Sequence, residues 1–179
     1  RVAADLADDY TDRLPKPPAK KNGKRVALVG AGPASLTVAN DLLPLGYDVV
    51  IYEGLPVPGG LMRSNIPSFR LPAEVLDREI NDIIGMGAEL RLGHRIESMK
   101  RLLADGFDAI FVGTGAPKGK ELKLPGRYDD AARVHIGIDW LESVAFEHIK
   151  SIGEKVLIIG VGNTAMDCCR SSLRLGATD

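Results

Sequence analysis

The sequence predicts an α/β fold built on a parallel β-sheet, and two features support this. First, one pattern occurs twice, as KRVALVGAGPAS at residues 24–35 and as EKVLIIGVGNTAMD at residues 154–167. In each copy a short β-branched apolar run leads into a glycine-rich turn and then into an amphipathic segment, which indicates strand, turn and helix. Second, apolar runs of strand length alternate along the chain with segments of helical periodicity, as expected for a parallel sheet.

The individual elements follow from these local patterns. We expect strands over residues 25–29, 48–52, 88–92, 108–112 and 155–159. We expect helices over residues 33–45, 73–87, 138–149 and 164–175, the first of them ended by Gly46. Residues 1–24 contain acidic residues, three prolines and a lysine-rich stretch, which predict an extended N-terminal linker.

Composition limits the class of protein without deciding its function. The 179 residues are 45% hydrophobic and carry 23 basic and 24 acidic side chains, which suits one α/β domain or two small ones. The net charge of −1 gives no general attraction to nucleic acid or to membranes. No apolar run reaches the ~20 residues of a membrane span and no signal peptide is visible, so we expect a cytoplasmic protein. The adjacent Cys168 and Cys169 form neither a C-x-x-C redox pair nor a metal-ligand pattern, and no metal site is expected.

The first glycine turn has the features of a dinucleotide-binding turn. Gly30 allows a tight turn after the strand, and Gly32 lets backbone N–H groups approach a pyrophosphate at the positive end of the helix. Pro33 suits the first helical turn, where its missing N–H is no loss. Ser35 replaces the usual third glycine, and we expect a modest packing change with binding retained. The alternative for Gly30 and Gly32 is a tight turn without a ligand.

Glu53 follows the expected strand 48–52 and lies 23 positions after Gly30. This separation fits an acid that hydrogen-bonds a ribose hydroxyl. A carboxylate there would repel a 2′-phosphate, so FAD or NAD is favoured over NADP at this site. The alternative is a solvated residue at the end of a strand.

The second glycine turn, GVGNTA at residues 160–165, has alanine at the third position, a known variant of the pattern. Asn163 and Thr164 lie at the helix start, where their side chains can cap N–H groups or reach a phosphate. The residue that selects NAD or NADP normally ends the next strand, which would lie beyond Asp179, so this choice stays open. Asp167 is either a polar contact near this site or a solvent-facing helical residue.

Three separated motifs resemble those of one family. After Glu53, GGL at residues 59–61 and NIPSFRLP at residues 65–72 resemble the G-G-L…G-I-P-x-F-R-L-P signature of a group of flavin oxidoreductases. This group includes the small (beta) subunit of bacterial glutamate synthase and the flavin-bearing part of dihydropyrimidine dehydrogenase. FVGTGAP at residues 111–117 resembles its second flavin-contact stretch, and residues 160–167 resemble its nicotinamide-dinucleotide turn. The departures are Asn65, where the family often has glycine, and Ser35.

The resemblance implies an organisation and a set of cofactor contacts. A linker (1–24) would precede a Rossmann-like FAD-binding domain (25–135) and the truncated beginning of a Rossmann-like NAD(P)-binding domain (136–179). Residues 32–35 would hold the FAD pyrophosphate, Glu53 the adenosine ribose and Ile96 the adenine. A guanidinium suits phosphate or an electron-rich flavin edge, although Arg70 could instead be a surface residue of a proline-rich loop. The expected cofactor-binding residues are Gly30, Gly32, Pro33, Ala34, Ser35, Glu53, Gly60, Leu61, Arg70, Ile96, Thr114, Gly115, Gly160, Gly162, Asn163, Thr164 and Ala165.

The leading functional hypothesis is therefore a flavin-dependent oxidoreductase with FAD and NAD(P)H as cofactors. It would pass electrons from NAD(P)H through FAD to an iron–sulfur centre or a partner subunit. No catalytic side chain is predicted because the cofactors carry the chemistry, and His94, His135 and His148 are expected to be surface or packing residues. The alternatives are a non-catalytic FAD-binding scaffold of a larger redox complex and a disulfide-reductase-like enzyme, which the missing C-x-x-C pair argues against.

We also expect the chain to be a segment of a longer polypeptide that is inactive alone. The second βα unit has one strand and one helix, which cannot bury both faces of a parallel strand. The family's iron–sulfur clusters would then lie outside this sequence, in other regions or in an iron–sulfur or large catalytic subunit. The terminal electron acceptor is not identified by these residues.

Overall fold

The computed structural model describes residues 14–123, 125–130 and 133–179. The chain divides into two compact units. The first, here called the sheet unit, comprises the described residues up to Pro58 together with Arg78–Gly113. The second, the helical unit, comprises Gly59–Asp77 and the described residues from Thr114 to Asp179. Of the expected linker, residues 1–13 lie outside the described residues, and residues 14–24 form neither helix nor strand.

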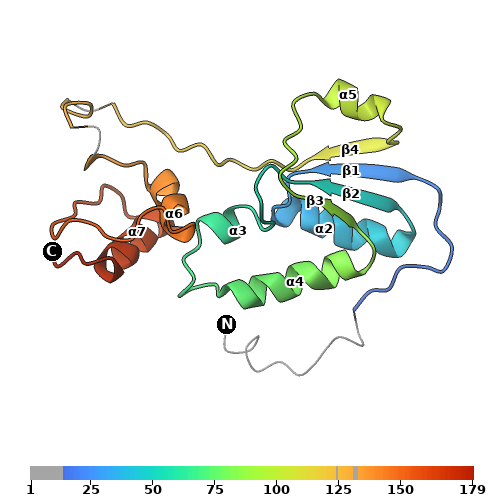
Figure 1. Ribbon diagram of the computed structural model, residues 1–179, viewed down its shortest axis with the longest axis horizontal. Helices are drawn as coiled ribbons and strands as arrows, with labels where there is room; N and C mark the ends of the chain where they lie inside the picture. Colours follow the sequence, from blue (N-terminus) through green and yellow to red (C-terminus); the bar gives the residue numbers. More distant parts are fainter. Residues whose placement is uncertain (1–13, 124, 131–132) are drawn as a thin grey trace. The chain divides into compact units, whose positions relative to one another are not determined.

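The sheet unit is built on a four-stranded parallel sheet, as the sequence predicts (Figure 1). Its strands follow the spatial order β3 (Glu89–Arg91), β2 (Asp48–Tyr52), β1 (Arg25–Val29) and β4 (Ala109–Val112). The two central strands are buried along almost their whole length because the sheet is covered on both faces. The register pairs Val29 with Tyr52, so the turns that follow β1 and β2 leave the sheet side by side.

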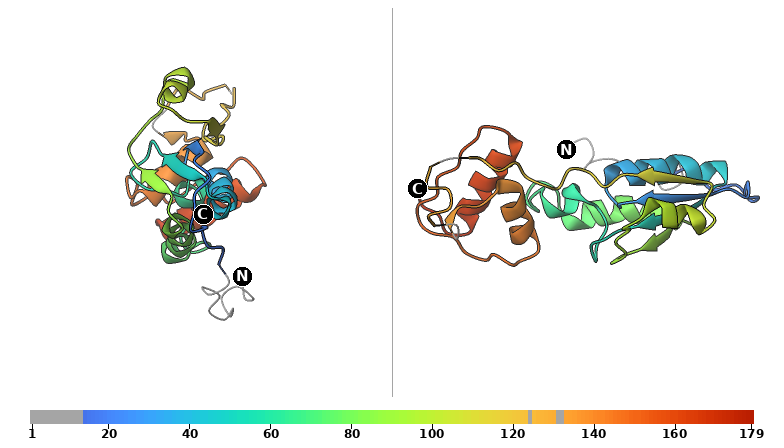
Figure 2. Two further views of the ribbon diagram at one scale, coloured as in Figure 1. Left: turned by 90° about the vertical axis from the view of Figure 1, so that its right-hand side faces the viewer. Right: turned by 90° about the horizontal axis from the view of Figure 1, so that it is seen from above.

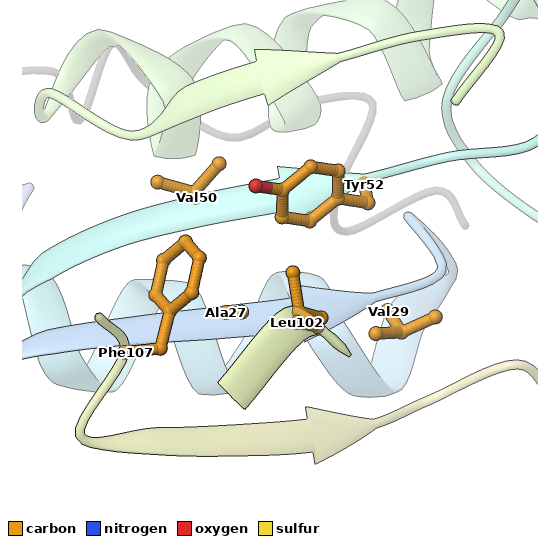
Figure 3. Packing of buried hydrophobic residues seen from close by; sticks show 6 residues of the cluster. All are labelled: Ala27, Val29, Val50, Tyr52, Leu102 and Phe107. Atoms are coloured by element: carbon orange, nitrogen blue, oxygen red, sulfur yellow. The ribbon is translucent and has the colours of Figure 1, made fainter. Parts of the chain in front are cut away.

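Alternating side chains of the central strands form cores on both faces of the sheet. One face carries the cluster drawn in Figure 3, with Ala27, Val29, Val50, Tyr52, Leu102 and Phe107. Leu102 comes from the short helix α5 (Met99–Ala104), and the Tyr52 and Phe107 rings meet edge-on with centroids 6.3 Å apart. The helix α2 (Pro33–Leu42) lies along the opposite face (Figures 2 and 3) and buries Leu36 and Ala39.

The elements of the sheet unit end close to the predicted positions. The expected helix 33–45 is α2 followed by one 3₁₀ turn, Leu43–Leu45. Gly46 ends it with a φ of +85°, a conformation that glycine adopts at little cost. The strands expected over 88–92 and 108–112 are shorter, and α4 (Ala73–Gly85) ends two residues before the predicted position. Helix α5 was not predicted, since six residues are too few to show helical periodicity.

The helical unit contains α3 (Leu61–Ser64), the first residues of α4 (73–77), α6 (Gly137–Ala145) and α7 (Asn163–Arg174), with irregular segments between α3 and α4 and between α6 and α7 (Figure 1). Helix α6 packs against both α3 and α7. The buried core of the helical unit is formed by Trp140, Leu141 and Cys168. Packed against this core are Val144, Ile149, Ile152, Ile158 and Leu175. No helix in the described ranges is long and apolar enough to cross a membrane.

The strand predicted over residues 155–159 is wrong, since this segment is irregular. It keeps the alternation of a strand, with Ile158 partly buried against the core and Leu157 89% exposed. The backbone N–H of Val156 donates to Asp179 O at 3.0 Å, but no strand in the described part of the chain pairs with it in a ladder. A strand needs such a neighbour to form its hydrogen bonds, and the local pattern alone does not supply one.

Candidate functional site

The two glycine turns have the same backbone conformation at the point where each helix begins. Gly32, before α2, has φ −81° and ψ 178°, and Gly162, before α7, has φ −82° and ψ 178°. In each turn the glycine two residues earlier has a positive φ, +96° at Gly30 and +143° at Gly160. The carbonyls of Gly32 and Gly162 accept the first helical hydrogen bonds at 3.0 and 3.1 Å. The glycine turn and the helix start of the sequence repeat are therefore repeated in the structure, whereas the strand before the first turn has no counterpart at residues 155–159.

Both helices present an amino-terminal turn without a side-chain cap. Neither Gly32 nor Gly162 can supply one, and no side-chain cap bond forms at either position. First-turn N–H groups and the helix dipole together favour an anion. A Cβ placed on Gly162 would meet no heavy atom within 4 Å, and Asn163 and Thr164 are exposed, so the second turn is open. This geometry fits the pyrophosphate of a dinucleotide at each turn.

Glu53 is buried beside the first glycine turn. One carboxylate oxygen accepts a hydrogen bond from the N–H of Ala31 at 2.7 Å and the other accepts one from Leu55 at 2.9 Å. The residue is 9% exposed, so it is not the solvated strand-end residue of the alternative interpretation. A carboxylate has about four lone-pair sites, so these two bonds leave acceptor capacity for a ribose hydroxyl.

Ser35 occupies the third position of the first motif and packs against Gly113, which follows β4. The serine is fully buried, and its Oγ has no hydrogen-bond partner among the residues that the structure describes. A Cβ on Gly113 would lie 2.3 Å from that Oγ, so the serine fits only because residue 113 has no side chain. The expected change in packing at the third position is thus compensated by the glycine directly after the neighbouring strand β4.

The structure divides the predicted cofactor-binding residues between the two units. The sheet unit contains Gly30, Gly32, Pro33, Ala34, Ser35, Glu53 and Ile96. The helical unit contains Gly60, Leu61, Arg70, Thr114, Gly115, Gly160, Gly162, Asn163, Thr164 and Ala165. Ile96 is half-buried and packs on the apolar cluster of Figure 3.

The Gly59-Gly60 pair begins the short helix α3. Gly60 has φ +54° and ψ −139°, and Gly59 has φ +120°. A Cβ on Gly59 would lie 3.0 Å from Leu76 Cδ2 and 3.1 Å from Arg63 Cβ, so both conformation and space require glycine there. Leu61 is half-buried at the start of α3, whereas Thr114 and Gly115 are exposed.

Arg70 forms an ion pair with Asp167 that the sequence did not predict. Its Nη1 lies 2.8 and 2.7 Å from the two carboxylate oxygens, and the side chains are 41% and 7% exposed for Arg70 and Asp167. Asp167 is therefore buried, and the alternative that it is a solvent-facing helical residue is wrong. Beside this pair, the Arg174 guanidinium lies 3.8 Å from the Phe69 ring centroid. The only signal in the sequence is that Asp167 and Arg174 are seven residues apart and so share a helix face.

Cys168 and the three histidines are further titratable groups in the part of the chain that the structure describes. Burial, followed by the charge of Asp167, raises the pKa of the Cys168 thiol to about 11. His94, His135 and His148, expected to be surface or packing residues, are exposed. Within the described ranges, no three histidine, cysteine or acidic side chains gather into a group that could hold a metal ion.

Several known proteins are similar in sequence to most of this chain. NADP(+)-dependent formate dehydrogenase subunit beta of Moorella thermoacetica is 38% identical over 162 residues, covering 88% of this chain and 23% of that protein. Glutamate synthase (NADPH) small chain of Mycobacterium tuberculosis is 37% identical over 177 residues, covering 91% of this chain and 36% of that protein. The chain thus spans about a quarter to a third of these relatives, and the predicted relation to the glutamate synthase small subunit is confirmed.

A solved structure shows the same fold. FprA of Mycobacterium tuberculosis in complex with NADPH matches with a TM-score of 0.69 at 21% identity, over 82% of this chain and 36% of that one. The family model described as pyridine nucleotide-disulphide oxidoreductase matches residues 24–178. Membership implies binding of FAD and NAD(P)H. The family match covers most of the chain, and the glycine turns and the parallel sheet agree with it. The chain therefore belongs to the pyridine nucleotide-disulphide oxidoreductase family.

Proposed function

We propose that this chain holds the FAD and part of the NAD(P)H site of a flavin-dependent oxidoreductase that delivers electrons to an iron–sulfur centre or a partner subunit. The observation that carries the proposal is the presence of two glycine turns at the amino ends of two helices, with matching φ and ψ angles at Gly32 and Gly162. When bound, the flavin supplies the redox chemistry by accepting a hydride equivalent and releasing electrons. The protein supplies position and electrostatic field.

In the sheet unit, residues 32–35 would hold the FAD pyrophosphate. Pro33 has no N–H, so the N–H groups of Ala34 and Ser35 would serve together with the helix dipole. Glu53 would accept a hydrogen bond from the adenosine ribose. The bonds from Ala31 and Leu55 already hold its carboxylate in place, so little reorganisation would accompany binding. A fixed negative charge there disfavours a 2′-phosphate, which supports FAD at this turn.

In the helical unit, residues 160–165 would hold the pyrophosphate of NAD(P)H. Support comes from the open space above Gly162 and from the uncapped first turn of α7. Gly60, Leu61, Arg70, Thr114 and Gly115 would contact the flavin or its phosphates, as the family signature implies.

The names of relatives support a partner subunit. The formate dehydrogenase relative is a subunit beta and the glutamate synthase relative is a small chain, so each works within an assembly. We propose that this protein likewise passes its electrons to a second subunit or to an iron–sulfur centre.

An anaerobic titration of the purified gene product with NADH and with NADPH tests the proposed function. We expect bound flavin whose visible absorbance is bleached by one or both nucleotides. Flavin that neither nucleotide bleaches would favour the scaffold alternative, and rapid turnover with a small disulfide as acceptor would favour the disulfide-reductase alternative. A protein that binds no flavin would contradict the proposal.

A further inference from the structure

The loop between α3 and α4, residues 65–72, is attached to one face of α7 at two adjacent positions. Arg70 forms its ion pair with Asp167, and the Phe69 ring lies against the guanidinium of Arg174. Asp167 and Arg174 are seven residues apart, about two helical turns, and lie on the same face of α7. All four residues belong to the helical unit. The loop thus runs along α7.

The beginning of the same loop is bound to α6. Asn65 Nδ2 donates to the carbonyl of Ile138 at 2.6 Å, and its Oδ1 accepts a hydrogen bond from Ser64 at 2.6 Å. Within the loop, the N–H groups of Arg70 and Leu71 donate to the carbonyl of Pro67 at 2.8 and 3.1 Å. The turn at Pro67, the bond from Asn65 to α6 and the contacts with α7 together restrict the positions that the Arg70 backbone can take.

The two side chains of the Arg70–Asp167 pair differ in solvent exposure, and this difference indicates which residue holds the other in place. The Asp167 side chain is 7% exposed and sits on a regular helix, whereas the Arg70 side chain is 41% exposed on a loop. A buried carboxylate is costly without a compensating charge, so it holds a guanidinium strongly. The helix therefore sets the position of the arginine.

We propose that Asp167 is a positioning residue that holds the Arg70 guanidinium at the flavin or its phosphates. The inference rests on the proposed function, which assigns residues 65–72 to the flavin. It adds that the helix beginning at the second glycine turn also orients the flavin loop, since Asp167 lies five residues after Gly162. One helix would then serve both cofactors, with its first turn toward the nicotinamide dinucleotide and its second turn toward the flavin loop.

A double-mutant cycle on the purified gene product tests this. The proteins are the wild type, Asp167→Asn, Arg70→Gln and the double variant, and the readouts are the FAD dissociation constant and the visible circular dichroism of bound flavin. We expect each single variant to weaken FAD binding about tenfold and to change the flavin spectrum in the same way. We expect the double variant to bind FAD no more weakly than Arg70→Gln alone.

Glu121→Gln is the matched control. It makes the same chemical change at another arginine–carboxylate pair of the helical unit, where Arg127 Nε lies 2.6 Å from Glu121 Oε1. It should leave FAD affinity and the flavin spectrum unchanged. Asp167→Glu retains the charge but displaces the carboxylate by one methylene, so it covers the case in which Asp167→Asn does not fold. Asp167→Glu should change the flavin spectrum even though the negative charge is retained, because the carboxylate that holds Arg70 is displaced.

The following outcomes would overturn the inference. Additive losses in the cycle would show that Asp167 does not act through Arg70. An Asp167→Asn protein that melts earlier but keeps the wild-type flavin spectrum and FAD affinity would show a merely structural role, as would an unchanged spectrum in Asp167→Glu. A wild-type protein without bound FAD would overturn the proposed function and this inference together, whereas normal FAD binding with silent Asp167 variants would overturn the inference alone.

Discussion

The carboxylate of Glu53 accepts a hydrogen bond from the backbone N–H of Ala31 at 2.7 Å, so the acid after β2 is fixed to the first glycine turn. The sheet register explains the contact. Val29 pairs with Tyr52, and the N–H of Gly30 donates to Tyr52 O at 2.7 Å. The turn and the acid therefore leave neighbouring parallel strands at the same edge, where ligands of such sheets bind.

Replacement of Glu53 by glutamine should destabilise the sheet unit. A glutamine has one acceptor oxygen, so one of the N–H donors of Ala31 and Leu55 would face an amide NH₂ group. The free energy of unfolding in urea should fall by about 1–3 kcal/mol. Glu89→Gln, the same change at a carboxylate that is 54% exposed and pairs with Arg91, should cost less than about 0.5 kcal/mol. Equal losses in the two variants would contradict the structural role of Glu53.

Gly113→Ala should be destabilising for steric reasons. Its Cβ would lie 2.3 Å from Ser35 Oγ and 2.9 Å from Phe111 Cε1. We expect overpacking to lower the free energy of unfolding by about 1–3 kcal/mol. The control Gly153→Ala, whose Cβ would meet no heavy atom within 4 Å, should show no comparable loss. Combination with Ser35→Ala should recover part of the loss, and full additivity of the two changes would argue against this contact.

Ser35→Ala alone should stabilise the protein. The Oγ is buried and lacks a hydrogen-bond partner in the described residues, and alanine has the higher helix propensity. Removal of the hydroxyl should raise the free energy of unfolding by about 1 kcal/mol. A decrease would show that the hydroxyl makes a favourable contact, and thermal unfolding of the two proteins side by side measures the sign.

Gly162→Ala should separate nucleotide binding from folding. Gly162 has φ −82° and open space around its Cβ position, so the free energy of unfolding should change by less than about 0.5 kcal/mol. The added methyl group would stand where backbone N–H groups approach a pyrophosphate, and the dissociation constant for NADH or NADPH should rise at least about tenfold. Gly85→Ala is the control, because a Cβ at Gly85 also meets no heavy atom within 4 Å, and it should leave the nucleotide dissociation constant unchanged. Unaltered nucleotide affinity in Gly162→Ala would place the nicotinamide site elsewhere.

The Cys168 thiol should be unreactive at neutral pH. Burial first, and then the charge of Asp167, raises its pKa from an ordinary 9.0 to about 11. The folded pKa lies above the unfolded value, so the resulting stability is fully present below pH 9.0 and is lost as pH rises through about 11. In a Cys169→Ser protein, alkylation by iodoacetamide should accelerate about tenfold per pH unit up to that value. A rate that levels off below pH 9.0 would contradict the burial of this thiol.

The central strands could be predicted from the sequence to the residue. RVALV and DVVIY are short, nearly continuous apolar runs, and such runs are typical of parallel strands buried on both faces. The first glycine turn and Glu53 could be predicted for the same reason, because their spacing reflects this sheet. Their roles toward cofactors remain predictions.

Other features depend on contacts that no local pattern contains. KVLII at residues 155–159 looks like RVALV, yet it lacks a neighbouring strand within the described residues and is irregular. Helix α3 has four residues, too few for a recognisable period. Arg70 and Asp167 are 97 positions apart in the sequence. Only the folded helical unit brings the loop arginine to the buried face of α7.

We propose that one chain holds two dinucleotides, one at each glycine turn. The stoichiometry of binding to the purified gene product tests this proposal, with FAD quantified after release and NADH or NADPH measured by equilibrium dialysis. We predict one FAD and one nicotinamide dinucleotide bound at the same time. Competition between FAD and the nicotinamide dinucleotide for a single site, or the absence of either, would contradict the claim.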